Sequence, residues 1–343
     1  MDVEVRKRVF ALIAFAIVSP GADNVTTLSA FSFLIMAATT YQDVAVDGMA
    51  VDLIPDAERA RANGLMFGGQ SIGIAMGTAL TGYAIADLGF SAAMLGNAGF
   101  VATMVLLLAV IRERPGERLL PWTEGQASSN TLSVQVNAWS VLIREVWKSM
   151  ISRDSRYHIV AQISQGTIYG LYVGVMPLIA TNLAGWTDSE FSGLTGTATL
   201  AAGLLGVSVF GMTADRLGSR PTTILSAALL GVLVILFWFA EPYWGESLSI
   251  KIAAFAFLSL FLCLQIAICA SAMKICSLKV AATQFTLFMA LANLGITLGS
   301  AFLGPLEALG GYHAILVAML IMALICGAAM FMFNEDAMKA RAV

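Results

Sequence analysis

Apolar residues in this chain form long runs that short polar segments separate. Runs such as 28–51, 64–86 and 281–304 reach or exceed the roughly 20 residues that an α-helix needs to cross the hydrocarbon of a bilayer. The pattern therefore predicts an all-α, polytopic membrane protein with about ten spanning helices. The predicted spans are 4–19, 28–51, 64–86, 89–111, 157–181, 190–213, 222–240, 251–273, 281–304 and 312–333.

Basic residues fall in every second connection between these spans. They precede the first span, fill the segment 112–156, occur near the C-terminus, and include Arg59, Arg61, Arg216, Arg220, Lys274 and Lys279. Lys251, at the edge of a span, breaks the pattern. Because cytoplasmic loops are enriched in Lys and Arg, we expect both termini in the cytoplasm. The first span, an apolar run after Arg6, Lys7 and Arg8, also fits a secretory signal peptide.

The composition narrows the class of protein further. Hydrophobic residues make up 58% of the chain and charged residues 12%, whereas a soluble domain carries about a quarter charged residues. The four cysteines lie in or beside apolar runs without zinc-type spacing, so we expect no disulfide framework, metal or cofactor. Two histidines and a net charge of -3 argue against a nucleic-acid partner. The expected surroundings are a lipid bilayer.

The chain contains an internal repeat with an offset of 222 residues. The offset aligns 71–94 with 293–316 and gives 8 identities in 24 positions, including four glycines. Glycine-mediated helix packing without duplication is the alternative reading. The same offset places 222–240 on the first span and leaves 157–213 without a counterpart. The first half is therefore expected to lack two helices that the second half has, giving four plus six in place of six plus six.

The segment after the span 190–213 reads G-M-T-A-D-R-L-G-S-R, residues 211–220. It resembles the cytoplasmic signature G-x-x-x-D-R-x-G-x-R of the major facilitator superfamily. Gly211 and Gly218 permit a tight turn, Asp215 can accept amide hydrogen bonds at a neighbouring helix N-terminus, and Arg216 and Arg220 can pair with helix ends. Such a clasp can hold one face of a transporter shut. The alternative is a basic turn that only sets topology.

A second stretch, residues 41–65, carries Q-D-x-x-x-D-G followed by L-x-P-x-x-E-R and N-G-L. It is similar to the muropeptide-permease, siderophore-permease and acetyl-CoA-transporter branch of the same superfamily. This resemblance extends through the spans 28–51 to 89–111 and is weaker beyond Pro121. It implies a transporter of two pseudo-symmetric helical bundles that rock about a site near the middle of the membrane.

The acidic end of the span 28–51 is a candidate for proton coupling. Asp43 and Asp47 are four residues apart and share a helix face, with Gln42 beside them and Asp43 about 12 Å from the helix end. A buried, unpaired carboxylate is costly there, so it must face a cavity, pair with a base or take up a proton. The alternative is a gate in which the acids pair with Arg59 or with the basic N-terminus. Asp52 is expected to be a solvated acid or a gate partner.

A polar stripe in the span 157–181 is the second candidate site. Its members are spaced three, four and three apart and fall on one helix face: Gln162, Gln165, Tyr169 and Tyr172. Since lipid does not tolerate such a stripe, we expect it to line the central cavity. Interhelical hydrogen bonding inside the bundle is the alternative.

These inferences predict three parts: an incomplete N-terminal bundle (1–111), a linker with an amphipathic helix at the cytoplasmic interface (112–156) and a six-helix C-terminal bundle (157–343). The expected function is proton-coupled uptake of a small organic solute by a monomer in a bacterial inner membrane. The alternative is a truncated membrane protein that does not transport, such as a relic, scaffold or sensor. An enzyme is disfavoured because no nucleophile is paired with a base.

Overall fold

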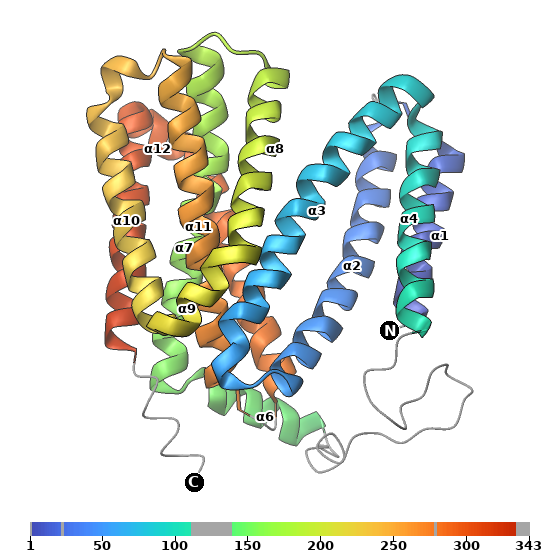
Figure 1. Cartoon of the computed structure of the whole chain (residues 1–343), viewed down its shortest axis with the longest axis horizontal. Coiled ribbons are helices and arrows are strands. Elements are labelled where there is room, and N and C mark those ends of the chain that lie inside the picture. Colours follow the sequence, from blue (N-terminus) through green and yellow to red (C-terminus); the bar gives the residue numbers. More distant parts are fainter. Residues whose placement is uncertain (1, 22–23, 111–138, 278–279, 334–343) are drawn as a thin grey trace. The chain divides into compact units, whose positions relative to one another are not determined.

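The fold is built from long apolar helices, because a backbone inside lipid must satisfy its own hydrogen bonds. The computed structural model describes residues 2–21, 24–110, 139–277 and 280–333, and these contain helices and no strand (Figure 1). The principal helices are α1 (Asp2–Val18), α2 (Val25–Leu53), α3 (Arg59–Leu88), α4 (Phe90–Val110), α6 (Trp139–Met150), α7 (Arg153–Asn182), α8 (Asp188–Leu205), α9 (Gly211–Leu217), α10 (Ser219–Phe239), α11 (Ser247–Ile275) and α12 (Ala281–Met332).

Three short elements complete the described chain: the 3-10 turns Asp56–Glu58 and Glu241–Tyr243, and a π-helical turn, η2 (Gly206–Phe210), between α8 and α9. The helix α12 is two helices in one, because Gly310 and Gly311 interrupt it with non-helical backbone. With α8 to α9 counted as one segment and α12 as two, the long helices of the described residues number ten, as expected. Within the described parts of the chain, six helices are long and apolar enough to cross a membrane by length and composition.

The structure repeats itself with the offset of 222 residues found in the sequence. Helix α2 covers 25–53 and α11 covers 247–275, while α3 begins at Arg59 and α12 at Ala281. Gly89 between α3 and α4 has a φ of +87°, and Gly311 between the two parts of α12 has a φ of +62°. Both glycines therefore use the left-handed region at the same turn of the repeat. The two halves share one helical plan from α1 and α10 onward.

The helices form two compact units, each described by itself. One contains residues 1–49 and 77–142, and the other contains 50–76 and 143–343. In the first, α1 packs on α4 through Leu12, Phe15 and Met94, and the Phe15 ring lies 4.9 Å from that of Phe90. In the second, α7, α10, α11 and α12 surround a core that includes Phe285 and other fully buried side chains. The three-part division expected from the sequence stays a prediction.

The amphipathic helix expected before the C-terminal bundle is present as α6. Ile143 and Trp147, one turn apart on its apolar face, are exposed, whereas Met150 packs against the core of the second unit. Ser152 accepts a hydrogen bond from the Ser155 amide and so caps α7, which follows directly. The remainder of the expected linker, up to residue 138, lies outside the described residues.

Candidate functional site

The Asp215 carboxylate of α9 receives the first backbone amides of α3. The Ala60 amide donates to Oδ1 and the Arg61 amide to Oδ2, each at 3.0 Å. The first N–H groups of a helix have no partner within the helix and carry partial positive charge, so a carboxylate there is doubly favourable. Helix α3 belongs to the first half of the repeat and α9 to the second. The hydrogen bonds expected of Asp215 are therefore confirmed, and they join the two halves.

Arg59 and Asn63 fasten the same end of α3 to α11. The Arg59 guanidinium donates through Nη1 to the Met273 carbonyl oxygen at 2.8 Å, in the last turn of α11. Helix C-termini favour cations, which suits this placement. The buried Asn63 amide donates to the Arg59 carbonyl oxygen at 2.7 Å and lies 3.3 Å from the Met273 sulfur. We call Arg59, Asn63, Gly211, Asp215 and Met273 the clasp.

The backbones of α3 and α9 approach each other so closely at the clasp that only glycine fits there. A Cβ at Gly211 would lie 2.8 Å from the Ala60 carbonyl oxygen and from the Arg61 Cα. A Cβ at Gly64, one turn further along α3, would lie 2.7 Å from the Gly206 carbonyl oxygen. Gly206 begins the π-helical turn, a deviation that often marks functional positions. The glycines thus let α3 and α9 touch without intervening side chains.

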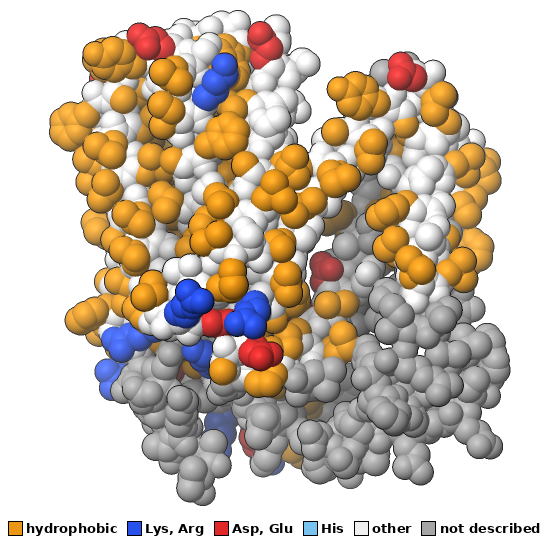
Figure 2. All heavy atoms as spheres, in the orientation of Figure 1, with side chains coloured by type: hydrophobic (Ala, Val, Ile, Leu, Met, Phe, Trp, Pro, Cys, Tyr) orange, Lys and Arg blue, Asp and Glu red, His pale blue; other side chains and the backbone are white. Residues whose placement is uncertain are grey.

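The remaining signature residues anchor α10. Gly218 has a φ of +95°, a backbone conformation that only glycine adopts without strain. Arg220 donates to the carbonyl oxygens of Met330 and Phe331 at the end of α12. Arg216 is exposed on the last turn of α9, and Lys274 donates to the Ser219 hydroxyl at 2.8 Å. Figure 2 shows Lys and Arg side chains gathered at the α9 end of these helices.

The polar stripe of α7 is packed inside the second unit. Gln165 donates to Gln162 Oε1 at 3.0 Å, and Gln162 Nε2 lies 3.2 Å from His158 Nε2. Gln162, Gln165 and Tyr172 are buried, and Tyr169 is half-buried. The Tyr172 ring stacks on Phe257 of α11 with centroids 3.7 Å apart. These hydrogen bonds run along α7 itself, and among the described residues none joins the stripe to another helix; Gln165 Oε1 and the Tyr172 hydroxyl are buried without a partner.

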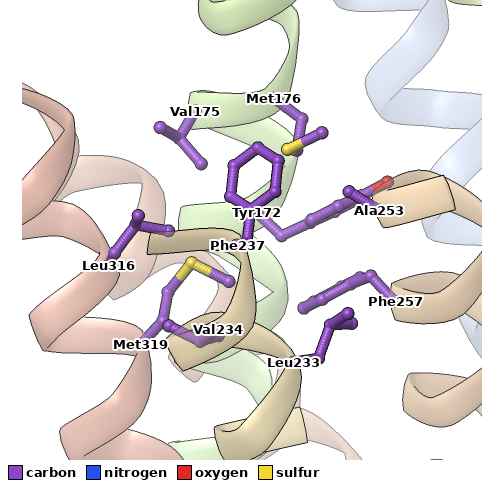
Figure 3. A pocket seen from close by; sticks show the side chains of 10 residues that line it. All are labelled: Tyr172, Val175, Met176, Leu233, Val234, Phe237, Ala253, Phe257, Leu316 and Met319. Carbon is purple, nitrogen blue, oxygen red and sulfur yellow. The ribbon is translucent and has the colours of Figure 1, made fainter. Parts of the chain in front are cut away.

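The cavity beside Tyr172 is small and apolar, so it is not the polar cavity expected around the stripe. Figure 3 shows the side chains of α7, α10, α11 and α12 that line it, including Met176, Phe237 and Met319. Its free volume is about 20 Å³, and its lining is apolar. Such a space holds about one water molecule and does not bind a polar solute. The cavity-lining role of the α7 stripe stays a prediction.

His158 is a buried polar residue of α7 that the sequence analysis did not single out. It is fully buried, touches the Phe288 ring edge at 4.8 Å between centroids, and has no partner at Nδ1. The sequence spacing could have indicated it, because His158 is four residues before Gln162 and lies on the same helix face as the stripe. Near it, the buried Gln284 of α12 lies 3.3 Å from the Ser155 hydroxyl. A row of polar side chains thus begins at the N-terminal end of α7.

The candidate residues of α2 differ in exposure. Asp43 is exposed, whereas Gln42 and Asp47 are half-buried. The side chain of Asp52 lies outside what the structure describes, as do those of the basic N-terminus. The acidic residues of α2 and the polar stripe of α7 belong to different compact units. That both line one cavity therefore stays a prediction. Among the described residues, no cluster of three metal-ligating side chains was found.

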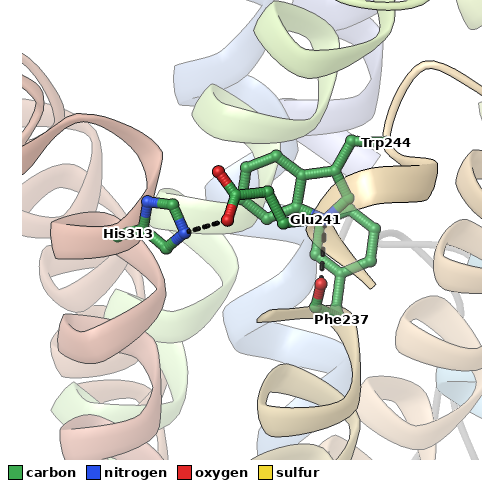
Figure 4. A network of polar contacts seen from close by, with 4 residues as sticks. All are labelled: Phe237, Glu241, Trp244 and His313. Atoms are coloured by element: carbon green, nitrogen blue, oxygen red, sulfur yellow. Dashed lines mark hydrogen bonds and ion pairs between the residues drawn. The ribbon is translucent and has the colours of Figure 1, made fainter. Parts of the chain in front are cut away.

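The other end of the second unit has a polar contact of its own. His313, two residues after the Gly311 turn, places Nε2 3.2 Å from Glu241 Oε2 (Figure 4). Its ring also lies 4.8 Å from that of Trp238. The repeat equivalents of His313 and Trp238 are Ser91 and Ala16, and the Ser91 hydroxyl donates to the Ala16 carbonyl oxygen at 2.7 Å. Equivalent positions therefore touch in both halves, through a hydrogen bond in the first half and a ring contact in the second.

Comparisons with known proteins agree with this architecture. The chain is similar in structure to a bacterial homologue of the iron transporter ferroportin, solved in an outward-facing state. The TM-score is 0.67 at 12% identity, covering 96% of this chain and 82% of that one, so the likeness concerns the fold. No curated protein sequence matches the chain. The family model of the Major Facilitator Superfamily matches residues 6–189, more than half of the chain, which therefore belongs to this superfamily of membrane transporters.

Proposed function

We propose that this protein is a proton-driven uptake transporter whose clasp opens and closes during alternating access. The observation that carries the proposal is the pair of hydrogen bonds from Ala60 and Arg61 to Asp215. These bonds join helices from the two halves of the repeat at one end only. Rocking of the halves about a central site has to break them each time this end opens.

The strength of the clasp suits a reversible gate. A hydrogen bond to a charged group contributes about 1.5–3 kcal/mol, so the two bonds to Asp215 contribute a few kcal/mol. Conformational equilibria of a few kcal/mol keep the minor state accessible, and a bound solute can then shift the population. A much stronger link would lock the transporter. The Arg59 bond to the Met273 carbonyl adds a second contact that must be released with the first.

Proton coupling is assigned to Asp43 and Asp47 on α2. Both lie on one face of a predicted span, where an uncompensated carboxylate is costly and protonation relieves the cost. Release and uptake of this proton on opposite sides of the membrane would drive accumulation. The resemblance of residues 41–65 to the muropeptide, siderophore and acetyl-CoA transporters suggests a solute of that kind.

We further propose that the clasp lies on the cytoplasmic side of a bacterial inner membrane. Arg59, Arg61, Arg216, Arg220 and Lys274 lie at this end of the helices, and cytoplasmic loops are the ones enriched in such residues. Both termini then lie in the cytoplasm. The protein is proposed to act as a monomer, since each bundle contributes its own half of the path.

Proteoliposomes that enclose a pH-sensitive dye test the function directly. Purified protein is reconstituted, an inward proton gradient is imposed, and radiolabelled anhydromuropeptide, a ferric hydroxamate siderophore or acetyl-CoA is offered in turn. The proposal expects one of these solutes to accumulate together with solute-dependent proton entry, and a protonophore, which collapses the proton gradient, to abolish the accumulation. Accumulation of none of them, with no solute-dependent proton entry, would favour the truncated, non-transporting alternative.

A further inference from the structure

The outer face of α6 is apolar, although a helix in water normally turns polar residues outward. Ile143 and Trp147 of α6 and Ile151, directly after it, are spaced four apart, and their exposed fractions are 65%, 69% and 47%. Met150, on the adjoining face, packs against the core of the second unit. Helix α6 therefore presents apolar side chains both toward the protein and away from it.

Basic side chains border this exposed apolar row. Arg144 and Lys148 each follow a residue of the row directly and lie one turn apart along its edge. Four basic side chains of the segment 143–156 are exposed: Arg144, Lys148, Arg153 and Arg156. Of the two acidic residues in the segment, Glu145 is half-buried and Asp154 is buried. The exposed charge of the segment is therefore positive.

The position of α6 brings this face to a membrane boundary. Figure 1 shows α6 lying crosswise to the long helices α7 and α11, at the end where α7 begins. Only Ile151 and Ser152 separate α6 from α7, and Ser152 caps α7. A helix that crosses the ends of membrane-spanning helices runs along the interface, where apolar side chains enter the acyl region and basic side chains reach the headgroups.

We propose that the α6 surface, formed by Ile143, Arg144, Trp147, Lys148 and Ile151, binds anionic phospholipids of the surrounding bilayer. The apolar row contacts acyl chains, and the two cations select headgroups with a net negative charge. A second copy of this surface would bring like charges together, which argues against pairing of two chains through it. The inference does not depend on solute, proton coupling or direction of transport.

Quenching of Trp147 fluorescence by brominated lipid tests the proposal, because bromine quenches indole fluorescence on contact. The full chain is reconstituted in phosphatidylcholine bilayers that contain an equal share of either brominated phosphatidylglycerol or brominated phosphatidylcholine. The signal of a Trp147→Phe chain is subtracted, which leaves the signal of Trp147. Arg144→Gln/Lys148→Gln removes the two cations, and Arg216→Gln/Lys251→Gln removes two exposed cations elsewhere as the matched control.

Brominated phosphatidylglycerol should quench Trp147 about five-fold more effectively than brominated phosphatidylcholine, which corresponds to about 1 kcal/mol for a basic residue near an anionic surface. The preference should vanish in Arg144→Gln/Lys148→Gln and persist in the control. Added salt should weaken it in the unmodified chain, and this result does not depend on the folding of a variant. Equal quenching by the two lipids would overturn the selection of anionic headgroups. No quenching by either lipid would show that water or another part of the chain covers this face, and the proposal would fall.

Discussion

Gly211 of α9 and Arg61 of α3 lie so close that a Cβ on Gly211 would stand 2.8 Å from the Arg61 Cα. Gly211→Ala should therefore push α9 away from α3 and lengthen both hydrogen bonds to Asp215. Loss of one charged hydrogen bond, about 1.5 kcal/mol, would raise the population with an open clasp about ten-fold. Gly196→Ala is the matched control, since a Cβ at Gly196 of α8 meets open space.

Alkylation of Cys276 reports this opening. Burial raises the pKa of the Cys276 thiol, and Arg59 offsets part of the rise. The thiolate is the reactive form, so the closed clasp should give slow reaction with N-ethylmaleimide at neutral pH. In a chain with Cys263, Cys269 and Cys326 replaced by alanine, Gly211→Ala should speed the reaction. Equal rates in Gly211→Ala and Gly196→Ala would show that close approach at Gly211 does not hold the clasp.

The positive φ of Gly218 makes a separate prediction about stability. Gly218→Ala should destabilise the protein by about 1–3 kcal/mol, because residues with a Cβ are strained in this region. Thermal unfolding in detergent, followed by tryptophan fluorescence, measures the effect. The melting temperature should fall for Gly218→Ala and should not fall for Gly196→Ala, because Gly196 lies inside α8, where alanine is the better helix former and meets open space. An unchanged melting temperature in both variants would mean that the turn accommodates a side chain.

Gln162 lies between His158 and Gln165 in the row of polar side chains along α7 and contacts both. Replacing it tests its role. Gln162→Leu leaves both His158 and Gln165 without a buried partner and should cost about 1–3 kcal/mol of stability. Val173→Ala, at an exposed position of the same helix, is the control. If Gln162 only packs, the variant should transport normally once corrected for folded protein. Loss of transport with unchanged stability would instead support the predicted cavity.

Asp43 is expected to carry the coupling proton. Asp43→Asn cannot release a proton at neutral pH, so proton-driven accumulation should fall to background while the protein remains folded in the membrane. The exposed Asp87 at the end of α3 provides a matched control, because Asp87→Asn removes the same charge from a position outside the proposed site. Uptake in proteoliposomes under an imposed proton gradient is the measurement. Normal accumulation by Asp43→Asn would remove this residue from the coupling role.

Local patterns predicted much of the fold. The lengths of the apolar runs predicted ten helical segments, and the glycine spacing predicted a repeat that the turns at Gly89 and Gly311 now confirm. The predicted ability of Asp215 to cap a neighbouring helix is also confirmed. These features depend on helix length, backbone conformation and amide chemistry, all of which act within a few residues.

Contacts between distant residues could not be predicted in this way. Nothing local indicates that Arg59 binds a carbonyl oxygen 214 residues away in α11. The α7 stripe was ambiguous for another reason, since the same spacing of polar residues serves a water-filled cavity or a packed interior. Here aromatic rings of α11 stack on Tyr169 and Tyr172, and Gln165 donates to Gln162, while Gln165 Oε1 and the Tyr172 hydroxyl are buried without a hydrogen-bond partner in the described parts of the chain. Packing partners, which the helical period does not specify, decide between the two.

The central claim is that Asp215 holds the two halves of the repeat together at the clasp. Spin labels at Ala57→Cys and Met212→Cys, both exposed positions, flank it in a chain otherwise free of cysteine. Double electron–electron resonance in nanodiscs then gives the distance distribution with and without Asp215→Asn. A dominant short distance that gives way to a longer one in Asp215→Asn is the predicted result. An identical distribution in both proteins would contradict the gate.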